Sequence, residues 1–177
     1  MDQELIIAGF GGQGILSMGK ILAYAGLHEG KNVSWLPSYG PEMRGGTANC
    51  NVIISEEEVA SPIVSNATAL IVMNQPSLEK FEDSLVPGGL VILDSSLVPV
   101  APERKDLKVF SIPATTKAYE MGNATFAGII LLGKFIGETK VTSRDNFENA
   151  LRSILPERKH SMIPDEMKAF DWGVQAD

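Results

Sequence analysis

Six residues near the start of the chain have the types and spacing of an anion-binding turn. Gly9-Phe10-Gly11-Gly12-Gln13-Gly14 matches the pattern G-x-G-x-x-G between an apolar run and a helix-like segment. In this pattern Gly9 permits a tight turn, Gly11 keeps a side chain away from a ligand, and Gly14 lets helix and strand pack closely. The free N–H groups at the start of the helix favour a negatively charged group. The motif predicts a turn that binds an anion or a partner, or a tight turn without a ligand.

A second glycine-rich segment carries a phenol, a carboxylate and a guanidinium. It reads Ser38-Tyr39-Gly40-Pro41-Glu42-Met43-Arg44-Gly45-Gly46, and a simple connection needs only its glycines and proline. Arg44 can form a forked pair with a carboxylate or a phosphate. The alternative is a surface pair between Glu42 and Arg44, which stabilises little. The residues predicted to face a partner or an active site are Ser38, Tyr39, Glu42, Arg44, Gly45 and Gly46.

Short apolar runs alternate with helical patterns along the chain, as in α/β proteins. Strands are predicted over residues 5–8, 33–36, 47–55, 69–73, 90–93 and 107–112. Helices are predicted over residues 13–29, from about 76, over 125–136, around 147–154 and near 165–170. These elements predict a three-layer α/β/α fold with a Rossmann-like, mostly parallel but mixed sheet and helices on both faces.

The first two predicted strands determine where the two glycine-rich segments meet. A helix joins them, which predicts a right-handed parallel unit. The loop between the second and third strands is too short for a helical crossover, so these two should be antiparallel neighbours. If the first two strands run parallel, both glycine-rich segments emerge at the edge of the sheet where open α/β folds bind ligands.

Several local signals mark the ends of these elements. Gly30 stands where a C-terminal glycine cap of the first helix belongs. Pro87-Gly88-Gly89 predicts a turn. Thr142 with Asp145 resembles a capping box, and Asn123 is either a helix cap or an amide offered to a partner.

Composition excludes several classes of function. The net charge of -7 and the pI near 4.9 argue against nucleic-acid binding. Cys50 is the single cysteine, and His28 and His160 lie far apart in sequence, so we expect no metal or iron–sulfur site. The N-terminus has no signal-peptide pattern and no apolar run is long enough to span a bilayer, so we expect a cytoplasmic protein.

A nucleotide-binding Rossmann domain would need one more residue. An acidic side chain at the tip of the second strand binds the ribose hydroxyls in such sites. Here that strand ends Trp35-Leu36-Pro37-Ser38-Tyr39, and Glu42 is the nearest carboxylate. The sequence therefore gives weak support to an NAD(P)-dependent oxidoreductase, which remains an alternative.

The two glycine-rich segments together resemble the gamma subunit, or gamma domain, of 2-oxoacid:ferredoxin oxidoreductases acting on pyruvate, 2-oxoglutarate or 2-oxoisovalerate. Ala69-Leu70-Ile71-Val72-Met73-Asn74 and Met121-Gly122-Asn123 are also similar to that family. The resemblance covers about residues 4–155 of a single domain, 1–177, with 156–177 as a C-terminal tail. Indolepyruvate oxidoreductase carries a similar subunit.

The resemblance implies a role inside a complex. Such enzymes convert a 2-oxoacid to an acyl-CoA and CO₂ and reduce ferredoxin. It implies that this chain binds no cofactor alone, and that thiamine diphosphate, Mg²⁺, iron–sulfur clusters and CoA belong to partner subunits. Those partners would be the alpha and beta subunits, with a delta subunit as a further candidate. It also implies no catalytic residue in this chain. A ligand-binding or scaffold module without enzymatic context remains a second alternative.

Overall fold

The chain forms a six-stranded mixed sheet with the strand order β2-β3-β1-β4-β5-β6. The computed structural model describes residues 2–38 and 47–177. The strands are β1 Gln3–Phe10, β2 Asn32–Ser38, β3 Thr47–Ser55, β4 Ala67–Val72, β5 Leu85–Asp94 and β6 Lys108–Ile112. β3 runs antiparallel to both of its neighbours, whereas β1, β4, β5 and β6 are parallel. The predicted mixed, mostly parallel sheet is therefore confirmed.

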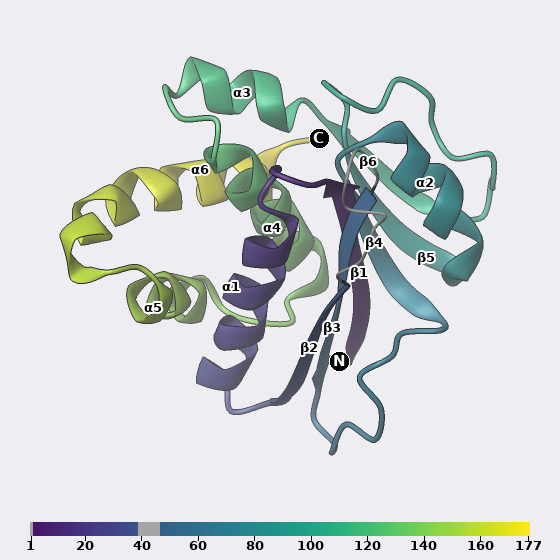
Figure 1. The fold of residues 1–177 in the computed structure, drawn as a ribbon, viewed down its shortest axis with the longest axis horizontal. Helices are drawn as coiled ribbons and strands as arrows, with labels where there is room; N and C mark the ends of the chain where they lie inside the picture. Colours follow the sequence, from purple (N-terminus) through teal and green to yellow (C-terminus); the bar gives the residue numbers. More distant parts are fainter. Residues whose placement is uncertain (1, 39–46) are drawn as a thin grey trace.

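Helices cover both faces of the sheet, as predicted, but they are shared unequally. They are α1 Ile15–His28, α2 Gln75–Phe81, α3 Ala114–Glu120, α4 Phe126–Thr139, α5 Arg144–Ile154 and α6 Ile163–Gln175, with short 3-10 turns η2 Glu82–Ser84 and η3 Glu157–Met162. Figure 1 shows α1, α4, α5 and α6 on one side and α2 on the other. Loops complete the cover beside α2.

The central strands are buried on both faces, which explains their continuous apolar sequence. Along β1, Leu5 and Ile7 face the larger core with α1 and α4, while Ile6 and Ala8 face the smaller core with α2. Side chains alternate between the faces because successive residues of a strand point in opposite directions. β1 therefore joins the two cores and fixes the position of the turn that follows it.

The structure corrects four local predictions. Ser143, not Thr142, caps α5, because its side chain accepts a hydrogen bond from Asn146 N at 3.1 Å. The residues of the predicted turn at 87–89 belong to β5, where the pairing with β4 shifts register. α3 was not predicted, and α6 is longer than the short helix expected at 165–170. The predicted glycine cap is correct, since Gly30 has a positive φ of 79° just after α1.

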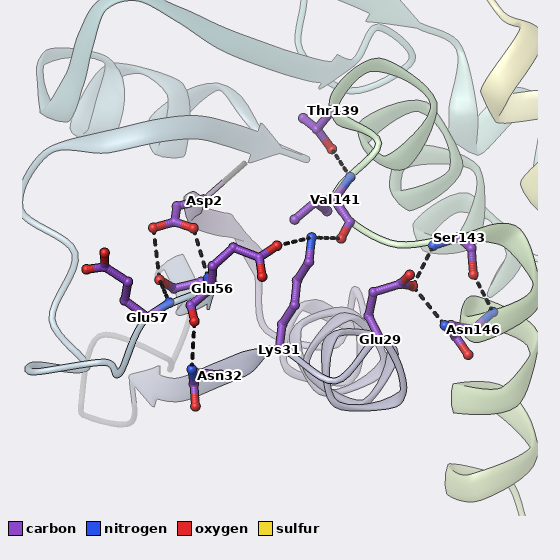
Figure 2. Close-up of polar contacts among 11 residues, drawn as sticks. Asp2, Glu29, Lys31, Asn32, Glu56, Glu57, Thr139, Val141, Ser143 and Asn146 are labelled. Atoms are coloured by element: carbon purple, nitrogen blue, oxygen red, sulfur yellow. Dashed lines mark hydrogen bonds and ion pairs between the residues drawn. The ribbon is translucent and has the colours of Figure 1, made fainter.

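A polar network closes the edge of the sheet opposite the glycine turn (Figure 2). Glu29, just after α1, accepts hydrogen bonds from Ser143 N at 3.0 Å and from Asn146 Nδ2 at 2.8 Å. Lys31 donates to the carbonyl of Val141 at 2.8 Å and pairs with Glu56 at 3.6 Å. The network thus ties α1, β2 and the end of β3 to the connection between α4 and α5.

Candidate functional site at the carboxyl edge of the sheet

The glycine turn is held together by the side chain of Gln13. Its Oε1 accepts a hydrogen bond from Phe10 N at 2.6 Å, and its Nε2 donates to the carbonyl of Met73 at 3.1 Å. One amide therefore closes the turn after β1 and joins it to the residue that follows β4. Both polar atoms of this amide have partners inside the chain, so Gln13 shapes the turn.

Two of the predicted glycine roles are exchanged in the structure. Gly14 has a φ of 78° and open space around a would-be Cβ, so it is needed for its backbone conformation and not for close packing. Gly9 is the closely packed position: a Cβ there would overlap Gln13 Oε1 and lie 2.8 Å from Ile15 Cδ1. Gly12 also has a positive φ, 90°, and Gly11 and Gly12 are exposed. Their bare backbone faces solvent at the start of α1.

The ends of β1 and β2 lie at the same edge of the sheet, as predicted. Phe10 pairs with Thr47, and Ser38 pairs with Asn49, so both strands end beside the start of β3. Ser38 itself is half-buried at the end of β2. Five residues predicted for the second loop lie outside the described residues: Tyr39, Glu42, Arg44, Gly45 and Gly46.

This edge departs from a nucleotide-binding Rossmann domain in two respects. The antiparallel strand β3 lies between β1 and β2, where such a domain has the two parallel strands side by side. The described residues of β2, Asn32–Ser38, include no carboxylate to bind a ribose. The chain therefore differs from a nucleotide-binding Rossmann domain both in the missing acidic residue and in its strand order.

A cavity of about 720 Å³ opens beside the glycine turn. This volume is in the range of small-molecule sites. Four predicted residues line it together: Gly12, Gln13, Gly14 and Asn123. Its walls come from α1, α3, α4, η3 and α6, and the residues that sequence reasoning missed include Met18, Met73, Thr115, Tyr119, Met162 and Glu166.

Asn123 lies two residues before the cap of α4. Its Oδ1 accepts hydrogen bonds from Thr125 N at 3.0 Å and from Thr125 Oγ1 at 2.7 Å. Thr125 occupies the cap position without a side-chain hydrogen bond to the helix. The amide oxygen therefore shapes the approach to α4 and is not the helix cap that the sequence suggested.

The cavity also contains a buried acid, Glu166. Only 7% of the residue is exposed, and Oε2 has no hydrogen-bond partner in the described part of the chain. Burial raises the pKa of Glu166, although Lys159 acts in the opposite direction. Helical spacing was the available sequence signal, because Ile163, Met167 and Phe170 place residue 166 on the buried side of a helix.

The single cysteine of the chain is not a reactive thiol in this structure. Burial raises the pKa of the Cys50 thiol to about 12, so it is protonated at neutral pH and a poor nucleophile. Among residues 2–38 and 47–177, no three His, Cys, Asp or Glu side chains gather as metal ligands. No helix in these same ranges is long and apolar enough to cross a membrane. The edge offers bare backbone and a cavity, which suits binding better than covalent chemistry.

These features define an α/β domain with a glycine turn at the carboxyl edge of a mixed sheet. Residues 4–176 match the family described as pyruvate ferredoxin/flavodoxin oxidoreductase. The chain belongs to this family.

Individual relatives show how the same unit occurs in chains of different length. The chain is 45% identical over 127 residues to the ketoisovalerate oxidoreductase subunit VorA of Methanothermobacter thermautotrophicus, covering 72% of this chain but 26% of that one. It therefore spans about a quarter of that relative. It is 35% identical over 160 residues to the 2-oxoglutarate synthase subunit KorC of Methanocaldococcus jannaschii, covering 88% of this chain and 85% of the relative.

A solved structure agrees over nearly the whole fold. The gamma subunit of a keto/oxoacid ferredoxin oxidoreductase from Geobacter sulfurreducens superposes with a TM-score of 0.83 at 31% identity, covering 98% of this chain and 96% of that one. The similarity includes α6, so residues beyond 155 belong to the shared fold.

Proposed function

We propose that this chain is the gamma subunit of a 2-oxoacid:ferredoxin oxidoreductase. In this role it contributes to the CoA-dependent oxidative decarboxylation of a 2-oxoacid to an acyl-CoA and CO₂, with reduction of ferredoxin. The observation that carries the proposal is the family match over residues 4–176 together with end-to-end similarity to a gamma subunit. It is an enzyme subunit that does not turn over substrate alone.

The proposed division of labour rests on the family resemblance. Thiamine diphosphate, Mg²⁺, iron–sulfur clusters and CoA would be supplied through partner alpha and beta subunits, with a delta subunit as a further candidate. A single buried cysteine cannot hold a cluster, which is consistent with this division. Names of relatives include ketoisovalerate, 2-oxoglutarate and pyruvate enzymes, so the substrate is proposed only as a 2-oxoacid.

The test is co-purification of the tagged chain from its native source, followed by a panel of 2-oxoacids. The isolated complex should reduce a ferredoxin-like acceptor only when CoA and one of the 2-oxoacids are present. The purified chain alone should show no activity. Turnover by the lone chain, or recovery without any thiamine- and iron-containing partner, would contradict the proposal.

We also propose that the loop around Tyr39 and Arg44 faces a partner subunit near the thiamine or CoA site. Its support is its composition and the position of Ser38 at the same edge as the glycine turn. Arg44→Ala should lower the activity or assembly of the reconstituted complex by at least about tenfold, since a bidentate charged contact contributes more than 1.4 kcal/mol. The circular dichroism spectrum of the free chain should not change.

Lys20→Ala is the matched control for this loop, because it removes one exposed positive charge from α1. It should leave assembly and activity within about twofold, since isolated surface charges contribute little. A complex that is equally active with Arg44→Ala would remove the loop from the mechanism.

A further inference from the structure

Glu166 is buried in the folded chain, but its carboxyl group lacks a complete set of hydrogen-bond partners. It lies in the first turn of α6, and its Oε2 has no hydrogen-bond partner in the described residues. An unsatisfied buried polar group costs free energy that an apolar residue would not cost. Ile163 and Met167, on the same side of α6, are buried in the apolar core. A glutamate at this position therefore needs a reason beyond packing.

The surroundings of Glu166 are those of a ligand site. It lines the cavity of about 720 Å³ beside the glycine turn. Met18, Met73 and Met162 line the same cavity, and methionine side chains adapt to ligands of different shape. The cavity thus combines an adaptable apolar wall with a buried carboxyl group.

Three other polar side chains that line this cavity have hydrogen-bond partners within the chain. Gln13 is bonded to Phe10 N and to the Met73 carbonyl. Asn123 Oδ1 accepts from Thr125. The hydroxyl of a third lining residue, Thr115, donates to Asp94 Oδ2 at 2.5 Å. In contrast, Glu166 lines the cavity and its Oε2 has no such partner in the described residues, so a donor on a ligand would satisfy it.

We propose that this cavity binds a small molecule with an apolar body and an ammonium group that hydrogen-bonds to Glu166. The apolar body lies against the methionines, and the ammonium group supplies the missing donor. A carboxylate in the same position would leave Glu166 facing a like charge, so anionic analogues are excluded from this part of the cavity. Lys159 is exposed, lines the same cavity and attracts the Glu166 carboxylate electrostatically. A bound ammonium group would replace this attraction.

The proposal is tested with three probes of equal length: hexylamine, 1-hexanol and hexanoate. They are titrated at neutral pH into the full chain with ¹³C-labelled methionine methyl groups. Hexylamine should shift the signals of Met18, Met73 and Met162, which line the cavity, and leave that of Met167, which does not line it, unchanged. Hexylammonium should bind at least about tenfold more tightly than hexanoate, a difference of about 1.4 kcal/mol.

Two variants show whether Glu166 causes this preference. Glu166→Gln should weaken hexylamine binding by about tenfold while leaving 1-hexanol within about twofold, because the amide keeps the shape and removes the charge. Asp165→Asn is the matched control, since Asp165 neighbours Glu166 in sequence but is exposed and pairs with Lys168 at 3.7 Å. It should bind all three probes as the wild type does.

The inference does not depend on the proposed enzyme complex, because every measurement uses the chain alone. It is overturned if none of the probes shifts the cavity methionines, if hexanoate binds as tightly as hexylamine, or if Asp165→Asn weakens hexylamine binding as much as Glu166→Gln does. Inactivity of the assembled complex would instead bear on the proposed function.

Discussion

Gly9 is the residue of the turn for which the structure leaves no room for a side chain. A Cβ would overlap Gln13 Oε1 and lie 2.8 Å from Ile15 Cδ1 and 3.2 Å from Met73 Cβ. Gly9→Ala should therefore displace the amide that closes the turn and lower the free energy of unfolding by about 1–3 kcal/mol. Urea denaturation followed by circular dichroism measures this loss.

Gly14→Asn separates packing from backbone conformation in the same turn. Gly14 has open space around its Cα, and asparagine tolerates a positive φ better than other residues with side chains. This variant should lose less than about 1 kcal/mol. If Gly9→Ala and Gly14→Asn lower the free energy of unfolding equally, the overlap at Gly9 is not what requires glycine there.

Glu166 should also limit stability, in a way that depends on pH. Because burial raises its pKa in the folded chain, folding becomes less favourable as pH rises above the unfolded value of 4.5 toward the folded pKa. Glu166→Gln should therefore raise the unfolding temperature at pH 7 and have a smaller effect at pH 4, where both states bind the proton. Scanning calorimetry at the two pH values tests this, and an equal gain at both would contradict it.

For single residues, the residue types predicted the turn but not which glycine has which role within it. The G-x-G-x-x-G spacing located the turn from Gly9 to Gly14, since glycine is required both for positive φ and for close approach. Which glycine serves which purpose depends on Ile15 and Met73, and Met73 follows β4, about sixty residues away in sequence. Glu166 was missed because only a short helix near 165–170 was predicted, which left out Ile163 and with it part of the buried side of α6.

Glycines let the backbones of α4 and α6 come into close contact where the two helices cross. A Cβ on Gly133 would overlap the Phe170 carbonyl oxygen and lie 3.1 Å from Phe170 Cα, and one on Gly173 would overlap the Ile130 carbonyl oxygen. Backbone atoms cannot rotate away as a side chain can. Gly133→Ala should therefore destabilise the chain by about 2–3 kcal/mol despite the better helix propensity of alanine. Urea denaturation measures the loss, and hydrogen exchange should show faster exchange in α6.

Gly137→Ala is the control on the same helix. Its tightest contact would be with Val174, 3.2 Å from Cγ1 and 3.3 Å from the backbone Cα, which is close but does not overlap as at Gly133. Alanine's helix propensity, about 0.8–1.0 kcal/mol better than glycine's, should offset that contact, so stability should change by less than about 1 kcal/mol. A loss as large as that of Gly133→Ala would show that α4 tolerates no added volume on either turn.

Elements were predicted well where periodicity was strong and poorly where tertiary contacts define them. β3 was predicted with its observed bounds, and α4 was recognised as buried from its apolar run over 125–136. α3 was missed because its seven residues, including two threonines and a lysine, show no apolar periodicity. The cap at Ser143 was missed because Thr142 beside Asp145 fits the same short pattern.

For the whole molecule, loop length was sufficient to predict the main feature of the topology. The short connection after β2 excluded a parallel crossover, and β3 is indeed antiparallel to β2 and lies between β2 and β1. This arrangement places the ends of β1 and β2 at one edge, which the candidate site requires. Residue patterns did not indicate that α1 and α3–α6 share one core and leave α2 on the other face, since that depends on packing between distant helices.

The opposite edge predicts how the fold responds to acid. Hydrogen bonds from the Asn146 side chain and the Ser143 N–H hold the pKa of Glu29 below its usual value of 4.5 (Figure 2). A lowered folded pKa means that ionised Glu29 contributes stability above pH 4.5 and that this contribution is lost as pH falls through the folded pKa. Glu29→Gln should therefore lower the unfolding temperature at pH 7, and its difference from wild type should shrink below about pH 4.

Scanning calorimetry between pH 7 and pH 3 checks this, with Glu157→Gln as the control because Glu157 is exposed at the start of η3. The control should match wild type at neutral pH, since it removes a surface charge outside this network.

The network joins the end of α1 to the start of α5, segments more than a hundred residues apart in sequence. Loss of one carboxylate should therefore loosen α5 as well, and faster hydrogen exchange confined to the end of α1 would show that the two segments are not coupled through Glu29.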